Sequence, residues 1–159
     1  MENINEIWTN FLYENGAIQE KNSLSNFEIH FNQKVKSSYE FISPLCHLGI
    51  LKVTGEDSSV FLQNQLTCNV FDLNESVSLI SGYCTPKGRL ISTMNVIKKF
   101  NDIYLVLPKE ILLSVKKRLE MFIFRSKVKI TDESNENIIL GLCFEENFLK
   151  KIFNKIPHS

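Results

Sequence analysis

The sequence predicts an α+β fold in which antiparallel sheets are flanked by amphipathic helices. Short turns separate three consecutive apolar segments, and apolar residues recur at helical spacing on both sides of them. The chain has 159 residues, of which 43% are hydrophobic and 23% are charged. This balance is typical of a globular chain with a buried core.

The first element predicted is a helix near the amino terminus. One face of it is apolar and consists of Ile4, Ile7, Trp8, Phe11 and Leu12. Gly16 can end this helix in a left-handed cap. Residues 21–39 are rich in Asn, Ser and Lys, and within them only residues 27–31 alternate as a strand does. We expect this region to lie mostly at the surface.

A strand, a turn and a helix are predicted next, followed by a meander of three strands. Residues 50–53 form the first strand and residues 54–56 the turn, and Asp57 can cap a helix that continues to Leu66. The strands of the meander are residues 77–83, 89–98 and 103–107. Because their connecting turns are short, consecutive strands must pair antiparallel.

The last third of the chain is predicted to hold a helix, two strands and a second helix. The first helix begins at Pro108, and its apolar face contains Ile111, Leu112, Val115, Leu119 and Phe122. The later elements are strands at 128–130 and 138–144 and a helix at 148–156. From Arg89 onward the order is therefore strands, a helix, two strands and a helix, as in a split β-α-β sheet that lacks its final strand. We therefore expect two subdomains, residues 1–100 and an incomplete ferredoxin-like one at 101–159.

Composition excludes several classes of function. The longest apolar run, residues 138–144, is too short to cross a membrane, and the amino terminus lacks the basic residues of a targeting peptide. Eighteen basic and eighteen acidic residues cancel, so nucleic-acid binding is not expected, although residues 109–129 are locally basic. Four cysteines without a CxxC pair indicate neither disulfides nor a metal site. We expect a cytoplasmic protein.

Three stretches resemble the YgfZ family of folate-binding or tRNA-modifying proteins, relatives of the glycine-cleavage aminomethyltransferase (T-protein). They are residues 47–67, which include HLGILKVTGED and FLQNQLT, residues 83–89 (YCTPKGR) and residues 124–128 (FRSKV). The resemblance spans the chain in order and implies the folate-binding fold of that superfamily. Two acids usual in the family are replaced by Cys68 and Thr85, and the family's Cys-containing second-half motif is absent from this sequence.

The resemblance implies a site for tetrahydrofolate or another folate. The amides of Gln63 and Gln65 suit the donor and acceptor edge of a pterin ring. Lys87 and Arg89 flank a glycine turn and suit an anionic glutamate tail, and Tyr83 could stack on a flat heterocycle. Each residue also has an ordinary structural interpretation. The two glutamines could lie on a solvated helix face, Lys87 and Arg89 could be solvated charges of a hairpin turn, and Tyr83 could be a core side chain.

By resemblance, the chain would be a non-catalytic accessory protein for iron–sulfur enzymes, including those that thiolate tRNA. In aminomethyltransferases an Asp on the strand after the glycine turn handles proton transfer. The matching positions here, Ser92 and Thr93, carry hydroxyls that do not act as acids or bases near pH 7. A folate-dependent aminomethyltransferase is the enzyme alternative. A third alternative is an interaction module that completes its sheet by self-association or with a complementing C-terminal half.

Overall fold

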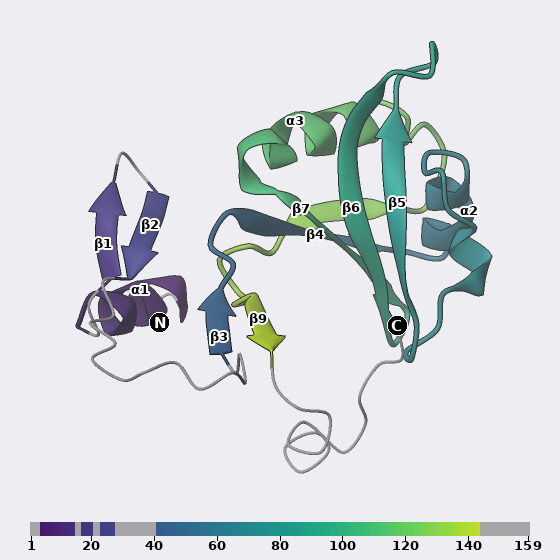
Figure 1. Ribbon diagram of the computed structural model, residues 1–159. Coiled ribbons are helices and arrows are strands. Elements are labelled where there is room, and N and C mark those ends of the chain that lie inside the picture. Colours follow the sequence, from purple (N-terminus) through teal and green to yellow (C-terminus); the bar gives the residue numbers. More distant parts are fainter. Residues whose placement is uncertain (1–3, 15–16, 21–22, 28–40, 144–159) are drawn as a thin grey trace. The chain divides into compact units, whose positions relative to one another are not determined.

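The computed structural model describes residues 4–14, 17–20, 23–27 and 41–143 (Figure 1). Within these ranges the chain has the predicted mixed α+β fold with antiparallel sheets and flanking helices.

The chain divides into two compact units. One comprises Met1–Cys46 and Asn135–Ile156, and the other comprises His47–Ser134 and Pro157–Ser159. The sequence suggested a boundary at residue 100 instead. That residue lies in the turn between two neighbouring strands of one sheet, so the units follow strand pairing rather than chain order.

The larger unit is built on a five-stranded antiparallel sheet with the order β5-β6-β7-β4-β8. Its strands are β4 (Leu48–Thr54), β5 (Ser78–Cys84), β6 (Leu90–Lys99), β7 (Asp102–Pro108) and β8 (Lys129–Asp132). The predicted meander is confirmed, since β5 pairs with β6 and β6 pairs with β7. The sequence did not show that β4 lies between β7 and β8.

Two helices and a short 3-10 turn complete this unit. They are α2 (Ser58–Gln63), η1 (Val70–Asp72) and α3 (Lys109–Glu120). Buried residues of α3, among them Leu112 and Val115, join a core with alternate residues of the strands such as Leu51 and Leu105. Alternation follows from the pleat, which sends successive side chains to opposite faces of a strand. Helix α3 starts directly after Pro108, as predicted.

The start of α2 differs from the prediction. Asp57 occupies the N-cap position, but its side chain makes no capping hydrogen bond to the helix. The carboxylate instead accepts a hydrogen bond from the backbone amide of Lys127 at 2.7 Å. The predicted capping role of Asp57 is therefore wrong. The helix also ends at Gln63, three residues before the predicted end at Leu66.

The smaller unit contains α1 (Ile4–Glu14), β1 (Ala17–Glu20), β2 (Ser23–Phe27), β3 (Phe41–Pro44) and β9 (Leu140–Cys143). Helix α1 confirms the first predicted helix. The strand predicted at 138–144 is also present as β9, but it pairs with β3, which the sequence did not reveal. Gly16, residues 28–31 and the predicted helix at 148–156 lie outside the described residues.

Candidate functional site

The end of α2 lies beside β5 and brings Gln65 close to the β5–β6 hairpin turn. Leu66 forms an antiparallel bridge with Tyr83, and Cys84 pairs with Leu90 on the other side of β5. Gln65 and Arg89 therefore lie at the same end of the sheet, on either side of one strand. Neighbouring strands are about 4.8 Å apart, so about two strand spacings separate the two backbones.

A buried serine anchors the segment that follows Gln65. Ser81 Oγ accepts hydrogen bonds from the consecutive amides of Thr67 and Cys68, both at 3.2 Å. The amide of Gly82 donates to Thr67 Oγ1 at 2.8 Å, and the Thr67 amide donates to the Gly82 carbonyl at 3.0 Å. These bonds join the segment to β5 and thus hold Gln65 near the hairpin turn.

The hairpin turn that carries the two candidate cations is ordered by its own hydrogen bonds. The amide of Thr85 donates to the Arg89 carbonyl at 2.8 Å, and the Arg89 amide donates to Thr85 Oγ1 at 3.1 Å. Gly88 has a φ of 77°, which a glycine adopts without strain. The turn projects at the top of Figure 1, and Lys87 and Arg89 are solvent-exposed. An anion could reach both cations.

The side chain of Gln63 is partly committed to the fold. Its Oε1 accepts a hydrogen bond from the amide of Val70 at 2.7 Å, which connects α2 to η1. The carbonyl oxygen of this amide group is thus used within the protein. Gln65 is half-buried, and it remains the candidate amide nearest the hairpin turn.

Tyr83 lies in the core and not at the surface. Only 2% of it is exposed, and it contacts the apolar core of the larger unit. Burial raises the pKa of its hydroxyl, while the nearby Arg118 guanidinium partly offsets that rise. The Tyr83 hydroxyl and Arg118 Nε are both buried without a hydrogen-bond partner among the described residues. A buried ring has no face open to solvent, so the site proposed below does not include Tyr83.

The positions that match the transferase's catalytic Asp lie on opposite faces of β6. Ser92 is buried, and its hydroxyl donates to the Thr93 carbonyl at 2.9 Å. Thr93 is exposed and pairs with Gly82 of β5. Glu56, one acid that could have supplied a carboxylate there, binds Lys127 Nζ at 2.6 Å instead.

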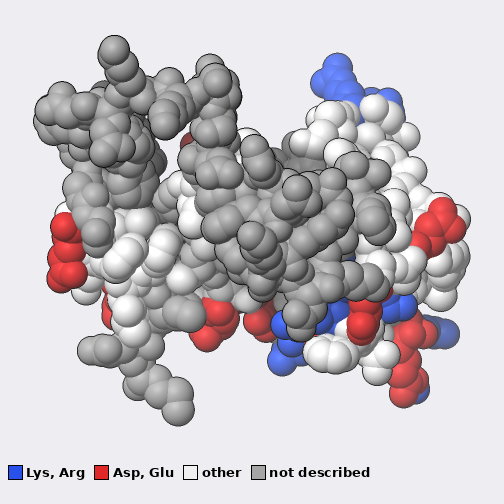
Figure 2. Space-filling model, turned by 60° about the horizontal axis from the view of Figure 1, so that its bottom comes forward, with Lys and Arg blue, Asp and Glu red and all other residues white. Residues whose placement is uncertain are grey.

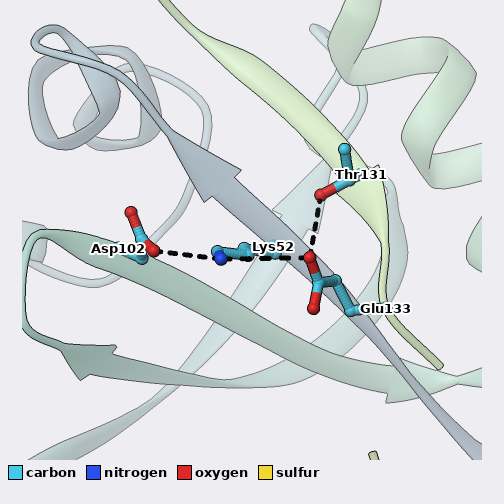
Figure 3. A network of polar contacts seen from close by, with 4 residues as sticks. All are labelled: Lys52, Asp102, Thr131 and Glu133. Atoms are coloured by element: carbon cyan, nitrogen blue, oxygen red, sulfur yellow. Dashed lines mark hydrogen bonds and ion pairs between the residues drawn. The ribbon is translucent and has the colours of Figure 1, made fainter. Parts of the chain in front are cut away.

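A polar network that the sequence did not reveal joins β4, β7 and the residue after β8 (Figure 3). Lys52 Nζ lies 3.1 Å from Asp102 Oδ2 and 3.9 Å from Glu133 Oε1. Thr131 Oγ1 donates to Glu133 Oε1 at 3.5 Å, and Lys52 Nζ lies 5.8 Å from the centre of the Tyr104 ring. The hydrogen bond with Asp102 is the main cause that raises the pKa of Lys52. The network connects neighbouring strands through paired charges.

Charges of both signs mix on the surface. In Figure 2, Lys and Arg side chains lie beside Asp and Glu at the lower right of the view, and a separate cluster of Lys and Arg stands at the top. Within the described residues, no three His, Cys, Asp or Glu side chains form a group that could hold a metal ion. No helix in the described part of the chain is long and apolar enough to span a bilayer.

Comparison with known proteins shows similarity to one set of curated relatives. The chain is 30% identical over 111 residues to the tRNA-modifying protein YgfZ of Hamiltonella defensa, a match covering 69% of this chain and 33% of that protein. It is 32% identical over 103 residues to YgfZ of Vibrio vulnificus, covering 64% and 31% of the two chains. The chain thus spans about a third of the length of these relatives. No family model matches it.

A solved structure shows the same fold. The aminomethyltransferase T of the glycine cleavage system from Bartonella henselae matches with a TM-score of 0.63 at 15% sequence identity. The match covers 74% of this chain and 36% of the transferase. The predicted aminomethyltransferase-like fold is therefore confirmed.

Proposed function

Because the chain belongs to the YgfZ family, we propose that it binds a folate, most simply tetrahydrofolate, and acts as a non-catalytic accessory protein in the cytoplasm. One observation carries the proposal of a site: Gln65 and Arg89 flank β5 at the same end of the sheet. One elongated ligand can therefore contact the amide of Gln65 with one end and the cations of the hairpin turn, Lys87 and Arg89, with the other.

The chemistry of this end of the sheet fits the two ends of a folate. The amide of Gln65 can donate to and accept from the polar edge of the pterin. Lys87 and Arg89 can pair with carboxylates of the glutamate tail. Exposed ion pairs contribute at most about 1 kcal/mol each, so the cations alone give weak binding. We expect a Kd in the micromolar range, about −8 kcal/mol.

The accessory role rests on the relatives, which are named tRNA-modifying proteins. We propose that the folate-bound chain assists iron–sulfur enzymes, including those that thiolate tRNA, without turning over substrate itself. The buried hydroxyl of Ser92, at a position where transferases carry an acid, supports a non-catalytic role.

Calorimetry with tetrahydrofolate tests the site. We expect saturable heat with the unaltered chain and weaker binding, by up to about 30-fold, for the Lys87→Gln, Arg89→Gln double variant, because two tail contacts of at most about 1 kcal/mol each are lost. Lys99→Gln is the matched control, since it removes an exposed lysine of β6 at the opposite end of the strand. Absence of heat from protein shown to be folded by circular dichroism would refute the site, as would equal affinity of all three proteins.

A further inference from the structure

The solvent-facing side of α3 carries an alternating row of cations and apolar side chains. The row consists of Lys109, Leu113, Lys117 and Met121, which are spaced four residues apart and are all exposed. Leu113 is 60% exposed and Met121 is 63% exposed. Residues four apart form one ridge along a helix. Two apolar side chains on this ridge face water, although the opposite side of α3 already supplies the core.

Helix α1 carries the complementary pattern. Glu6 and Glu14 are exposed, and α1 contains no lysine or arginine. Between them on the adjacent row lie Ile7, which is 52% exposed, and Phe11, which is 50% exposed. The helix therefore presents acids on either side of an apolar pair.

The two patterns have the same spacing. Glu6 and Glu14 are eight residues apart, as are Lys109 and Lys117. Eight residues of helix rise about 12 Å in both cases. When four-residue ridges of two helices interdigitate, the ridges themselves lie parallel. Both acids can then meet a lysine while Ile7 and Phe11 contact Leu113.

We propose that the chain self-associates through α1 of one copy packed on α3 of a second copy. The assembly that this proposal implies is a twofold-symmetric pair, which contains the contact twice. Specific interfaces bury at least about 1,000 Å², and only two helices of 11 and 12 residues from each copy would contribute here. The dimer is therefore reversible. This inference is independent of folate binding.

Sedimentation velocity of the full chain over a range of concentrations tests the dimer. We expect a monomer–dimer equilibrium in the unaltered protein. Lys109→Glu with Lys117→Glu should weaken the dimer at least about tenfold, and Glu6→Lys with Glu14→Lys should do the same, because attraction becomes repulsion. Combining all four changes should restore the dimer. Lys99→Glu with Lys129→Glu is the control, since it alters net charge equally away from α3.

Several outcomes would overturn the proposal. A monomer at every concentration excludes it, and so does a dimer that either charge reversal leaves unchanged. A four-residue charge exchange that does not restore association also contradicts the pairing of these helices. A last outcome concerns the variant that carries both Glu6→Cys and Lys109→Cys. If the two cysteines cross-link within a monomer, α1 packs on α3 of the same chain, and the proposal that α3 binds α1 of a second copy is wrong.

Discussion

The backbone amide of Lys127 donates a hydrogen bond of 2.7 Å to the carboxylate of Asp57, which lies 70 residues earlier in the chain. Lys127 Nζ also binds Glu56 Oε2 at 2.6 Å, and Gly55 lies against the Lys127 carbonyl. Two of the three stretches that resemble the YgfZ family thus meet at one point. The contacts of Glu56 and Asp57 with Lys127 hold the turn between β4 and α2 against the loop before β8.

Replacing Asp57 tests the strength of this connection. Asp57→Ala leaves the backbone amide of Lys127 without its acceptor and should lower the free energy of unfolding by about 1 kcal/mol. The loss is smaller than that of a buried hydrogen bond to a charged group, because this hydrogen bond is exposed to water. Asp57→Asn keeps an acceptor oxygen and should lose less. Urea denaturation measures both. Asp72→Ala, at an exposed carboxylate of η1, should change stability by less than about 0.5 kcal/mol.

Two glycines with positive φ predict a matched pair of alanine variants. Gly55 has a φ of 115°, and a Cβ there would overlap the carbonyl oxygen of Lys127. Gly55→Ala should therefore destabilise the protein by more than about 2 kcal/mol. Gly88 has a φ of 77° with open space around it, so Gly88→Ala should cost only about 1 kcal/mol. Similar urea midpoints for the two variants would contradict this account.

The Lys52 network predicts a loss of stability at alkaline pH. Pairing with Asp102 raises the pKa of Lys52 above its ordinary value of 10.5. Because the folded state favours the charged form of Lys52, this interaction stabilises the fold at pH values below 10.5. The stabilisation is lost as the pH rises through the pKa that Lys52 has in the folded state. Lys52→Met removes the charge and keeps an apolar chain. Its deficit in urea denaturation should be full at pH 7 and should shrink above about pH 10.5. A deficit that stays constant over that range would argue against the network.

Tyr83 predicts a late-titrating phenol. A solvent-exposed tyrosine ionises near pH 10. Burial raises the pKa of the Tyr83 hydroxyl, so Tyr83 should ionise at a higher pH than that. The ultraviolet absorbance of the tyrosinate, followed as the pH rises in the folded protein, measures the ionisation. The Tyr83→Phe variant should lack the latest step, and loss of an earlier step instead would place Tyr83 in contact with water.

The salt dependence of folate affinity should distinguish the contribution of the two cations from that of the Gln65 amide. Binding of a folate with several glutamates should weaken as sodium chloride rises, since exposed charges are screened beyond about 10 Å at 0.1 M. The Lys87→Gln, Arg89→Gln variant should bind more weakly at low salt and vary less with salt. Titrations at two salt concentrations measure this. Equal salt dependence in the two proteins would show that the hairpin turn does not hold the tail.

Much of the candidate site could be placed from local sequence, but its internal contacts could not. The turn around Gly88 was predictable because glycine allows the positive φ that the turn needs. The involvement of Gln63 with Val70 was not, since it depends on how separate elements pack, and for Tyr83 the sequence offered both a stacking role and the core position that the structure shows. An amide or an aromatic ring has the same local signal in a site and in a core.

Local sequence was sufficient for elements whose shape depends on near neighbours. The meander β5–β6–β7 follows from short turns, and α1 and α3 follow from apolar residues at helical spacing. Tertiary structure alone decided that β4 lies between β7 and β8, that β9 pairs with β3 and that Asp57 binds Lys127. These pairings join residues far apart in the chain, and many registers share the same apolar pattern. Only packing of the whole unit selects among them, because each alternative would leave core side chains in water or polar groups unpaired.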